Sequence, residues 1–323
     1  MTKETILVLS DPHDLQIARL AKKLPGVKIV AGNSQATFAP HAATATVLCN
    51  FSGSLELFRT VFAMCLQLRW VHSRSVGLDK ALFADLIASD VPLTNGSGVF
   101  SPALGEFVLG AILFFAKDFR RLIRQQMAQR WEIFDVAMAR GKTVGIVGYG
   151  NIGRAIAARI RPLGMKILAL KRSAPAPGEK DSLVDEFFAP MQRIAMISRS
   201  DYIVVAAPLT PETRGMIGEA EFAAMKPTAV AVNIGRGPVI DEKALLRALS
   251  ENRIKGAALD VFDHEPLPQG HPFYSLENVL LSPHSADHTP DWLDESTDFF
   301  VEQFDRYRQG QSLLNVVDKK LGY

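Results

Sequence analysis

Short apolar runs alternate with helix-like segments along most of this chain, and no other feature of the sequence restricts its fold as strongly. The runs are rich in Val, Ile and Leu, as expected of strands that are buried on both faces. They form two series: TILVLS, VKIVAG, ATVLCN, LRWVHS and VPLTN within residues 5–95, and TVGIV, KILAL, DYIVVAA, TAVAVN, GAALDV and NVLLS within residues 143–282. Strands that alternate with helices in this way predict parallel sheets with helices on both faces.

Two helical stretches set the predicted domain boundaries. A long helix from about Pro102 to Arg130 separates the two series of strands. Residues 291–309 predict a polar helix that is too small to be a domain, so we expect it to pack on the first series and to make that domain discontinuous. The chain of 323 residues is long enough for two cores, and we predict two doubly wound α/β domains. The predicted domains comprise residues 1–97 with 287–323, and residues 98–286.

The overall composition gives no sign of a nucleic-acid, membrane or metal partner. The formal net charge is +2 with 22% charged residues, and no long run carries one sign of charge. Cys49 and Cys65 are the only cysteines, too few for a disulfide framework or a zinc site, which fits a reducing compartment. We therefore expect no nucleic acid, no membrane and no metal.

The apolar segments also indicate a cytoplasmic protein. The start of the chain, MTKETILVLSD, lacks the basic and apolar regions of a signal peptide. The run FVLGAILFFA at 107–116 is too short to span a bilayer, and we expect it to be a buried helix at a domain or subunit interface. The segment APAPGE at 174–179 is interpreted as a surface loop.

The stretch TVGIVGYGNIGR at 143–154 places three glycines directly after a strand-like run. Gly148, Gly150 and Gly153 have the GxGxxG spacing, which by itself could mark a simple tight turn. Here a strand precedes the glycines and a helix follows, which is the setting of a dinucleotide-binding turn. The glycines would permit the turn, the approach of a pyrophosphate and close helix packing, in that order, and the helix N-terminus would attract the anion. We predict a dinucleotide-binding domain of the Rossmann type.

Three chemically active side chains follow three successive strands of the second series. Because the carboxyl ends of parallel strands share one edge of a sheet, Arg236, Glu265 and His284 are expected in one crevice. An arginine can pair with a substrate carboxylate and polarise its carbonyl, a histidine can exchange a proton near neutral pH, and a carboxylate can orient the imidazole. Each side chain could instead be structural, as a loop tie, a solvated carboxylate or a satisfied histidine. Their joint placement favours hydride transfer to a 2-oxo acid.

Nearly the whole chain resembles the D-isomer-specific 2-hydroxyacid dehydrogenases, a family that includes glyoxylate and hydroxypyruvate reductases. The resemblance implies a Rossmann-type nucleotide domain inserted in a flavodoxin-like substrate domain. It is carried by the stretches VGYGNIG, AAPLTPETRGMIG, NIGRGPVID, ALDVFDHEPLP, HPFYSLENVLLSPH, SVGLDK and LTNGSGVFSPALGEFVLG.

The resemblance also implies roles for individual residues and a homodimer joined through the nucleotide domains. Arg236 would bind and activate the substrate, Glu265 would support the histidine, and His284 would be the acid/base. Asp260 would contact the nicotinamide carboxamide. The expected substrate contacts are Ser75, Val76, Gly77, Arg236 and His284. The expected cofactor contacts are Gly148, Tyr149, Gly150, Asn151, Ile152, Gly153, Lys171, Arg172, Ser173, Pro208, Thr213, Ile234, Arg236, Asp260 and His284.

The segment after KILAL predicts the choice of cofactor. An NAD-selective site carries an acidic residue about 20 positions after the first glycine. This chain has Lys171, Arg172 and Ser173 there, and the first acidic residue beyond them is Glu179. Arg172 can pair with a 2′-phosphate, so we predict that NADP(H) is favoured and that NAD(H) is possible. The two cations could also simply solvate the end of a strand.

The identity of the substrate depends on the loops around the pocket. Small residues at Ser52, Gly53, Ser75 and Gly77, with the resemblance of VFSPALGEF to the glyoxylate/hydroxypyruvate reductases, favour a small 2-oxo acid over an aromatic one. Arg74 stands where many relatives have a small or neutral residue; we interpret it as an exposed surface arginine, with contact to a second anionic group of the substrate as the alternative.

Two other functions fit the same fold. One is a non-catalytic NAD(H)-sensing protein, and the other is a formate dehydrogenase, although the family's formate enzymes have glutamine in place of Glu265.

Overall fold

The computed structural model describes residues 4–79, 81–173 and 181–323, and the predicted loop at 174–179 lies outside them. The chain forms two compact units, one of Met1–Val99 with Thr289–Tyr323 and one of Phe100–His288. Each unit is built on its own parallel sheet. The predicted fold class, two doubly wound parallel-sheet domains, is confirmed.

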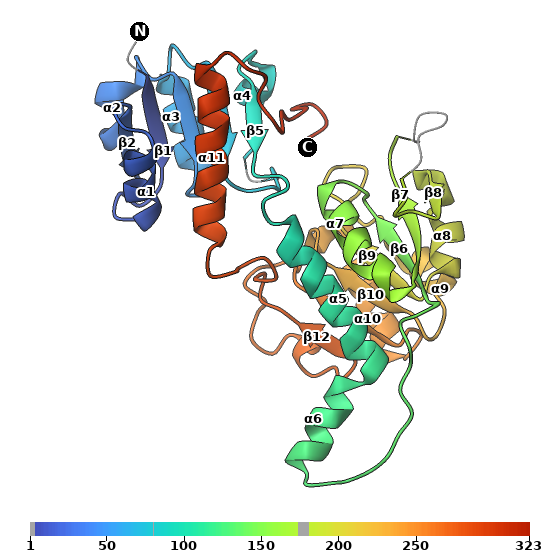
Figure 1. Ribbon diagram of the computed structural model, residues 1–323. Coiled ribbons are helices and arrows are strands. Elements are labelled where there is room, and N and C mark those ends of the chain that lie inside the picture. The colour runs from blue at the N-terminus through green and yellow to red at the C-terminus, as the bar shows by residue number, and fades with distance from the viewer. Residues whose placement is uncertain (1–3, 80, 174–180) are drawn as a thin grey trace. The chain divides into compact units, whose positions relative to one another are not determined.

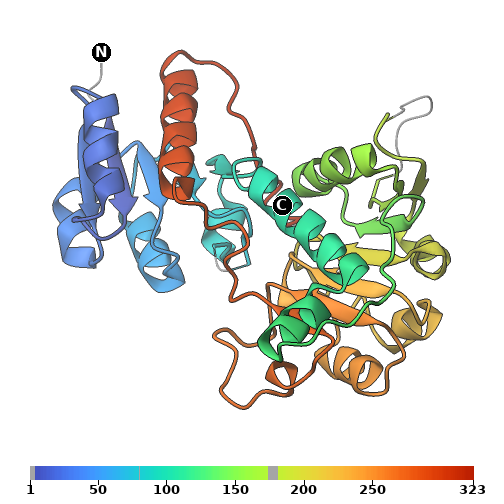
Figure 2. The same cartoon turned by 60° about the horizontal axis from the view of Figure 1, so that its bottom comes forward.

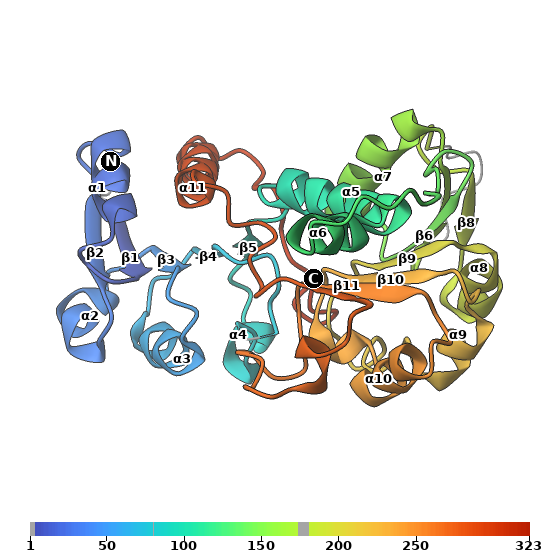
Figure 3. The same ribbon diagram turned by 90° about the horizontal axis from the view of Figure 1, so that it is seen from below.

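The first unit contains a five-stranded parallel sheet in the order β2-β1-β3-β4-β5, the flavodoxin-like order. Its strands are β1 (Thr5–Leu9), β2 (Lys28–Gly32), β3 (Val47–Asn50), β4 (Trp70–Ser73) and β5 (Leu93–Asn95). Its helices are α1 (Leu15–Lys23), α2 (Gln35–Ala42), α3 (Leu55–Met64), α4 (Ala84–Ala88) and α11 (Trp292–Arg308). Figure 3 shows α1 and α11 on one face of the sheet and α2, α3 and α4 on the other.

The polar helix expected near the end of the chain is α11, and it packs beside α1. Its apolar side contributes Phe300, which is buried and stacks on Trp70 of β4 with ring centroids 5.2 Å apart. Its polar side pairs Asp298 with Arg19 of α1 at 2.7 Å. The amphipathic pattern therefore places α11 on the first sheet, against residues that are distant from it in sequence.

The second unit contains a seven-stranded parallel sheet in the order β12-β11-β10-β9-β6-β7-β8. Its strands are β6 (Thr143–Val147), β7 (Lys166–Leu170), β8 (Glu186–Phe188), β9 (Tyr202–Val205), β10 (Val230–Asn233), β11 (Gly256–Leu259) and β12 (Val279–Leu281). Its α-helices are α5 (Ser101–Lys117), α6 (Phe119–Met127), α7 (Asn151–Ile160), α8 (Arg193–Arg199), α9 (Glu219–Ala224) and α10 (Glu242–Ser250). The strand order is that of a Rossmann sheet with one additional strand, and it reverses between β6 and β9.

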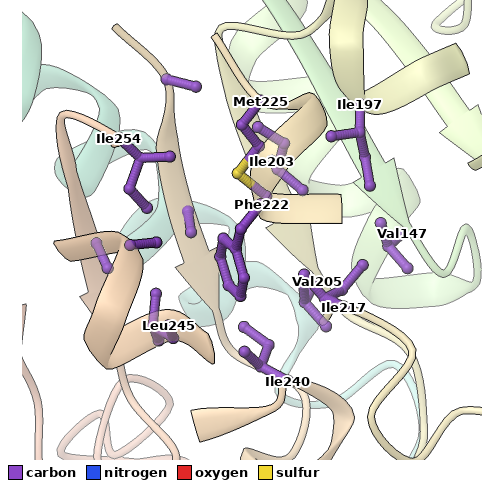
Figure 4. Packing of buried hydrophobic residues seen from close by; sticks show 14 of the residues in the cluster. Val147, Ile197, Ile203, Val205, Ile217, Phe222, Met225, Ile240, Leu245 and Ile254 are labelled. Carbon is purple, nitrogen blue, oxygen red and sulfur yellow. The ribbon is translucent and has the colours of Figure 1, made fainter. Parts of the chain in front are cut away.

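Two apolar layers cover this second sheet. On one face α5 packs against α7, as Figure 2 shows. On the other face Phe222 of α9 is buried among side chains that include Val205, Ile217 and Ile240, as Figure 4 shows. Because helices cover both faces of the sheet, the strands consist of continuous apolar residues. This composition allowed the strands to be predicted from the sequence.

One local prediction for this unit was wrong, and one strand was missed. The single helix expected over about 102–130 is divided into α5 and α6 at Asp118, which has a left-handed backbone (φ 50°) and whose side chain caps α6 by accepting from the amide of Arg121. The short strand β8 was not predicted, because it is a three-residue edge strand that begins with the exposed Glu186.

Candidate functional site

The glycine turn between β6 and α7 leaves room for a ligand in front of its middle glycine. A Cβ atom on Gly148, where φ is 96°, would lie 2.6 Å from the amide nitrogen of Ala207, so a side chain cannot fit. A Cβ atom on Gly153 would lie 2.6 Å from the carbonyl oxygen of Gly148. At Gly150, which is the N-cap of α7 and receives no side-chain cap, a Cβ atom would meet nothing within 4 Å. Two glycines therefore permit close packing, and the third leaves space where a pyrophosphate can approach the helix N-terminus.

The loop after β9 borders the same edge of the sheet, next to the glycine turn. The Thr213 hydroxyl donates to the carbonyl oxygen of Pro208 at 2.6 Å and accepts from the amide of Thr210 at 2.8 Å. This side chain thus fixes the shape of the loop that carries Pro208. Both of these hydrogen bonds of Thr213 are made to backbone groups of the loop.

The turn after β10 holds Arg236 by the backbone. Asn233, at the end of β10, accepts from the amide of Gly235 at 3.2 Å and donates to the carbonyl oxygen of Arg236 at 3.2 Å. Asn233 is buried and was not among the predicted site residues; its position directly before the IGRG stretch is the signal that could have indicated it. A Cβ atom on Gly237 would collide with the backbone of Phe262, so this turn lies directly against the turn after β11.

The turns after β11 and β12 bring two predicted site residues into contact. His284 Nδ1 lies 2.7 Å from Glu265 Oε2, and the other carboxylate oxygen of Glu265 accepts from the amide of Phe262 at 2.9 Å. The His284 side chain is 41% exposed and the Glu265 side chain 28% exposed, so a small molecule can reach the imidazole. With Nδ1 facing the carboxylate, Nε2 is the nitrogen left for a ligand.

Asp260 fastens the turn that carries His284. Its Oδ1 atom accepts from the Ser282 hydroxyl at 2.5 Å and from the amides of Ser285 and Ala286 at 2.9 and 3.1 Å. His284 itself has a left-handed backbone (φ 52°), which is uncommon for a residue with a side chain. A buried carboxylate therefore holds the two amides that follow this strained residue. The sequence indicated Asp260 as a cofactor contact but gave no sign of this anchoring.

The segment after β7 presents the predicted cofactor cations at the same edge of the sheet. The amide of Lys171 donates to the carbonyl oxygen of Phe188 at 3.1 Å, and Arg172 and Ser173 are exposed. The Thr210 hydroxyl and the backbone amide of Glu212 hold the pKa of Glu212 below its usual range, and Arg172 contributes in the same direction to a smaller extent. Tyr149, beside the glycines, donates from its hydroxyl to Asp181 at 2.9 Å. Ile234, after β10, is buried.

The predicted substrate loop Ser75–Gly77 lies in the first unit, directly after β4. Its shape is held by Asn95, whose side-chain amide donates to the carbonyl oxygen of Val76 at 3.0 Å. The amides of Ser75, Val76 and Gly77 donate no hydrogen bond to any of the residues that the structure describes. Consecutive amides without an acceptor are suited to a carboxylate.

The interpretation of Arg74 as an exposed surface arginine is wrong. Its guanidinium lies over the rings of Phe51 and Trp292, 5.0 and 5.5 Å from their centroids, and it donates to the carbonyl oxygen of Phe51 at 2.7 Å. The side chain is thus held by contacts with two aromatic rings. Sequence alone could not indicate this, because the three residues come from widely separated parts of the chain.

The described residues include no group of His, Cys, Asp or Glu that could hold a metal ion. In the same ranges, none of the helices is long and apolar enough to cross a membrane.

The chain belongs to the D-isomer-specific 2-hydroxyacid dehydrogenase family. Residues 109–286 match the family's NAD-binding domain. The fold, the glycine turn and the family together define an NAD(P)-dependent oxidoreductase that acts on small 2-oxo or 2-hydroxy acids.

Individual relatives place the chain near the glyoxylate reductases. It is 33% identical over 270 residues to a glyoxylate reductase of Korarchaeum cryptofilum, covering 81% of this chain and 79% of that one. A glyoxylate reductase of Thermococcus kodakarensis is 35% identical over 273 residues, covering 81% of this chain and 80% of that one.

Solved structures show the same fold over almost the whole length. One is an NADPH-dependent glyoxylate/hydroxypyruvate reductase from Sinorhizobium meliloti in complex with NADP and sulfate, with a TM-score of 0.85, 26% identity and coverage of 99% of this chain and 100% of that chain. Another is a D-isomer-specific 2-hydroxyacid dehydrogenase from Xanthobacter autotrophicus in complex with NADPH and MES, with a TM-score of 0.84, 29% identity and coverage of 98% and 99%.

Proposed function

We propose that this enzyme reduces a small 2-oxo acid such as glyoxylate or hydroxypyruvate to the D-2-hydroxy acid, with NADPH as the favoured reductant. The observation that carries the proposal is the pairing of His284 with Glu265 at the sheet edge that also carries the glycine turn. The relatives named as glyoxylate reductases support the substrate class.

His284 is the proton donor in this proposal. The Glu265 carboxylate lies 2.7 Å from Nδ1 and thereby fixes the orientation of the ring. Nε2 then faces outward and gives its proton to the carbonyl oxygen of the substrate as that oxygen gains negative charge. Glu265 in turn is aligned by the amide of Phe262.

Arg236 binds and polarises the substrate. Its turn is fixed by Asn233 and lies against the turn that leads to Glu265. A planar guanidinium there can contact the carboxylate and the carbonyl oxygen together, which draws electron density from the carbon that is reduced. The unpaired amides of Ser75–Gly77 supply a second contact for the carboxylate.

The cofactor, when bound, supplies the hydride, and residues of the second unit hold it. The glycine turn and the N-terminus of α7 receive the pyrophosphate, with Tyr149, Asn151 and Ile152 alongside it, while Pro208, Thr213, Ile234 and Asp260 border the dinucleotide. Arg172, with Lys171 and Ser173 beside it, binds the 2′-phosphate of NADPH. NAD(H) remains a slower alternative because the 2′-phosphate contact would be absent. Complexes of two relatives with NADP or NADPH support this preference.

We also propose a cytoplasmic homodimer joined through the second unit. The segment from α6 to residue 138 extends from that unit, as Figure 1 shows, and its exposed apolar side chains include Trp131 and Ile133 at 96% and 93% exposure. An apolar segment of this kind is expected to be covered by a protein partner. A second copy of the chain is the partner that this proposal names. A reducing cytoplasm fits the two free thiols of Cys49 and Cys65.

A spectrophotometric screen tests the function. We expect the loss of NADPH absorbance with glyoxylate or hydroxypyruvate to be faster than with phenylpyruvate, and faster with NADPH than with NADH. A protein that binds NADPH but reduces none of these 2-oxo acids would be the nucleotide-sensing alternative, and a preference for phenylpyruvate would contradict the proposed substrate size.

A further inference from the structure

A guanidinium in contact with two aromatic rings is the least expected feature of the first unit. Arg74 lies directly after β4, Phe51 directly after β3, and Trp292 begins α11. The Arg74 guanidinium is 5.0 Å from the Phe51 ring centroid and 5.5 Å from that of Trp292. We call these three side chains the Arg74 clamp. The two rings hold the guanidinium by cation–π contacts, and its remaining N–H groups can still donate to a ligand.

The positive charge of the Arg74 clamp lacks an acidic partner. Its one hydrogen bond to a described residue is the bond to the carbonyl oxygen of Phe51, and no carboxylate in the described ranges forms an ion pair with it. Burial lowers the pKa of Arg74, and the nearby Asp14 carboxylate only opposes this effect in part. Asp14 is itself engaged by the hydroxyl of Ser10. A half-buried cation with spare N–H donors costs free energy unless an anion accompanies it.

The Arg74 clamp lies where ligands bind in folds of this type. The strand order of the first sheet reverses between β1 and β3, and the helices α1 and α3 that follow these strands cover opposite faces, as Figure 3 shows. Ligands of open α/β sheets bind beyond the carboxyl ends of the strands at this point. Phe51 and Asp14 follow those two strands, and Arg74 follows the neighbouring β4.

The same turn also carries the row of unpaired amides. Arg74 immediately precedes Ser75, Val76 and Gly77, whose amides donate to none of the described residues. Two separate kinds of anion-binding donor therefore stand side by side: a fixed guanidinium and consecutive backbone N–H groups. One carboxylate can occupy the amides, and the guanidinium then faces a different group of the same molecule.

We propose that Arg74 binds a second anionic group, a carboxylate or a phosphate, of the 2-oxo acid substrate. This inference rests on the proposed function and extends its substrate class to 2-oxo acids that carry a second anionic group, which should be better substrates than matched monoanions. Arg74 is then a specificity-determining residue, and Phe51 and Trp292 position it.

The test compares two pairs of substrates that differ in the second charge. Oxaloacetate and 4-methyl-2-oxopentanoate have nearly the same shape, because two methyl groups replace the two terminal carboxylate oxygens. The second pair is 3-phosphohydroxypyruvate and hydroxypyruvate, which shows whether a phosphate is the preferred group. For each pair kcat/KM is measured with NADPH in the wild type, in Arg74→Gln and in Arg74→Lys. The wild type is expected to prefer the dianion of at least one pair.

Arg74→Gln is expected to lower the dianion-to-monoanion ratio of kcat/KM by about thirtyfold, the loss typical of a desolvated charge pair. Arg74→Lys keeps the charge without the planar contact, so its ratio should fall less. Arg59→Gln is the matched control, since it removes an exposed arginine of α3, and its ratio should equal that of the wild type.

Two outcomes would overturn the proposal: a wild-type preference for the monoanion of both pairs, or an unchanged ratio in Arg74→Gln, including the case in which both members of a pair lose equally. Equal losses would mean that Arg74 only shapes the loop or binds the carboxylate that all substrates share.

A calorimetric titration of oxaloacetate into the NADP⁺-bound protein separates this proposal from the proposed function. Binding that depends on Arg74 in a protein that reduces no 2-oxo acid would support the anion site and contradict the reductase. If the protein reduces 2-oxo acids but Arg74→Gln leaves the binding of oxaloacetate unchanged, the reductase function is supported and the anion site at Arg74 is contradicted.

Discussion

The imidazole Nδ1 of His284 and the carboxylate Oε2 of Glu265 lie 2.7 Å apart, although the two residues are 19 positions apart in sequence. The turns after β11 and β12 bring them together, and Asp260 at the end of β11 fastens the turn that carries His284. The geometry of the His284–Glu265 pair thus also depends on Asp260, which lies at the same edge of the sheet.

Replacing Glu265 by glutamine tests the charge of this pair. Glutamine can still accept a hydrogen bond from His284 but removes the negative charge that strengthens this bond and holds the ring, so kcat for reduction should fall roughly ten- to a hundredfold. Steady-state kinetics with saturating NADPH measure the change. The neighbouring His264→Gln, which alters an exposed side chain, should leave kcat unaffected. Equal rates for Glu265→Gln and the wild type would exclude a role for the carboxylate charge.

Replacing Asp260 by alanine tests the anchoring of the His284 turn. The amides of Ser285 and Ala286 would lose their acceptor, so the free energy of unfolding should fall by about 1–3 kcal/mol and kcat should fall with it. Urea titration and kinetics measure the two effects. Ser282→Ala removes only one of the three hydrogen bonds and should have a smaller effect on both. A fall in cofactor affinity with unchanged kcat would instead favour a purely cofactor-binding role for Asp260.

Arg172 is expected to decide between the two nicotinamide cofactors. Arg172→Asp should lower the NADPH-to-NADH ratio of kcat/KM by roughly tenfold or more, because aspartate repels the 2′-phosphate that arginine binds. Lys166→Asp makes the same charge change at the exposed opposite end of β7 and should preserve the ratio. A wild type that favours NADH, or a ratio that Arg172→Asp does not alter, would contradict this role.

The apolar segment after α6 is expected to form the dimer contact. Trp131→Asp and Ile133→Asp place a charge where a partner would bury an apolar side chain, so the molar mass in solution should fall from that of a dimer toward that of a monomer. Size-exclusion chromatography with light scattering measures the change. Met191→Asp, at an equally exposed methionine of the second unit, should remain dimeric. A wild type that is monomeric at micromolar concentration would refute the proposed assembly.

Particular residues show what the sequence could and could not predict. The strands other than β8 were predictable because helices cover both faces of each sheet, which makes the strands continuous apolar runs. GYGNIG also lay in the expected strand–turn–helix setting. The pairing of Glu265 with His284 followed from parallel strands ending at one edge. The break at Asp118, the anchoring by Asp260 and the Arg74 clamp were not predictable, because each depends on backbone angles or contacts between segments that are distant in sequence.

One comparison of rates shows whether His284 donates the proton in reduction of a 2-oxo acid. The turnover of glyoxylate or hydroxypyruvate with saturating NADPH is measured for the wild type and for His284→Ala, with NADPH binding followed by fluorescence in both. We expect a loss in kcat of roughly a hundred- to ten-thousandfold with NADPH affinity preserved, as for a lost general acid. Turnover of His284→Ala within a few-fold of the wild type would contradict it.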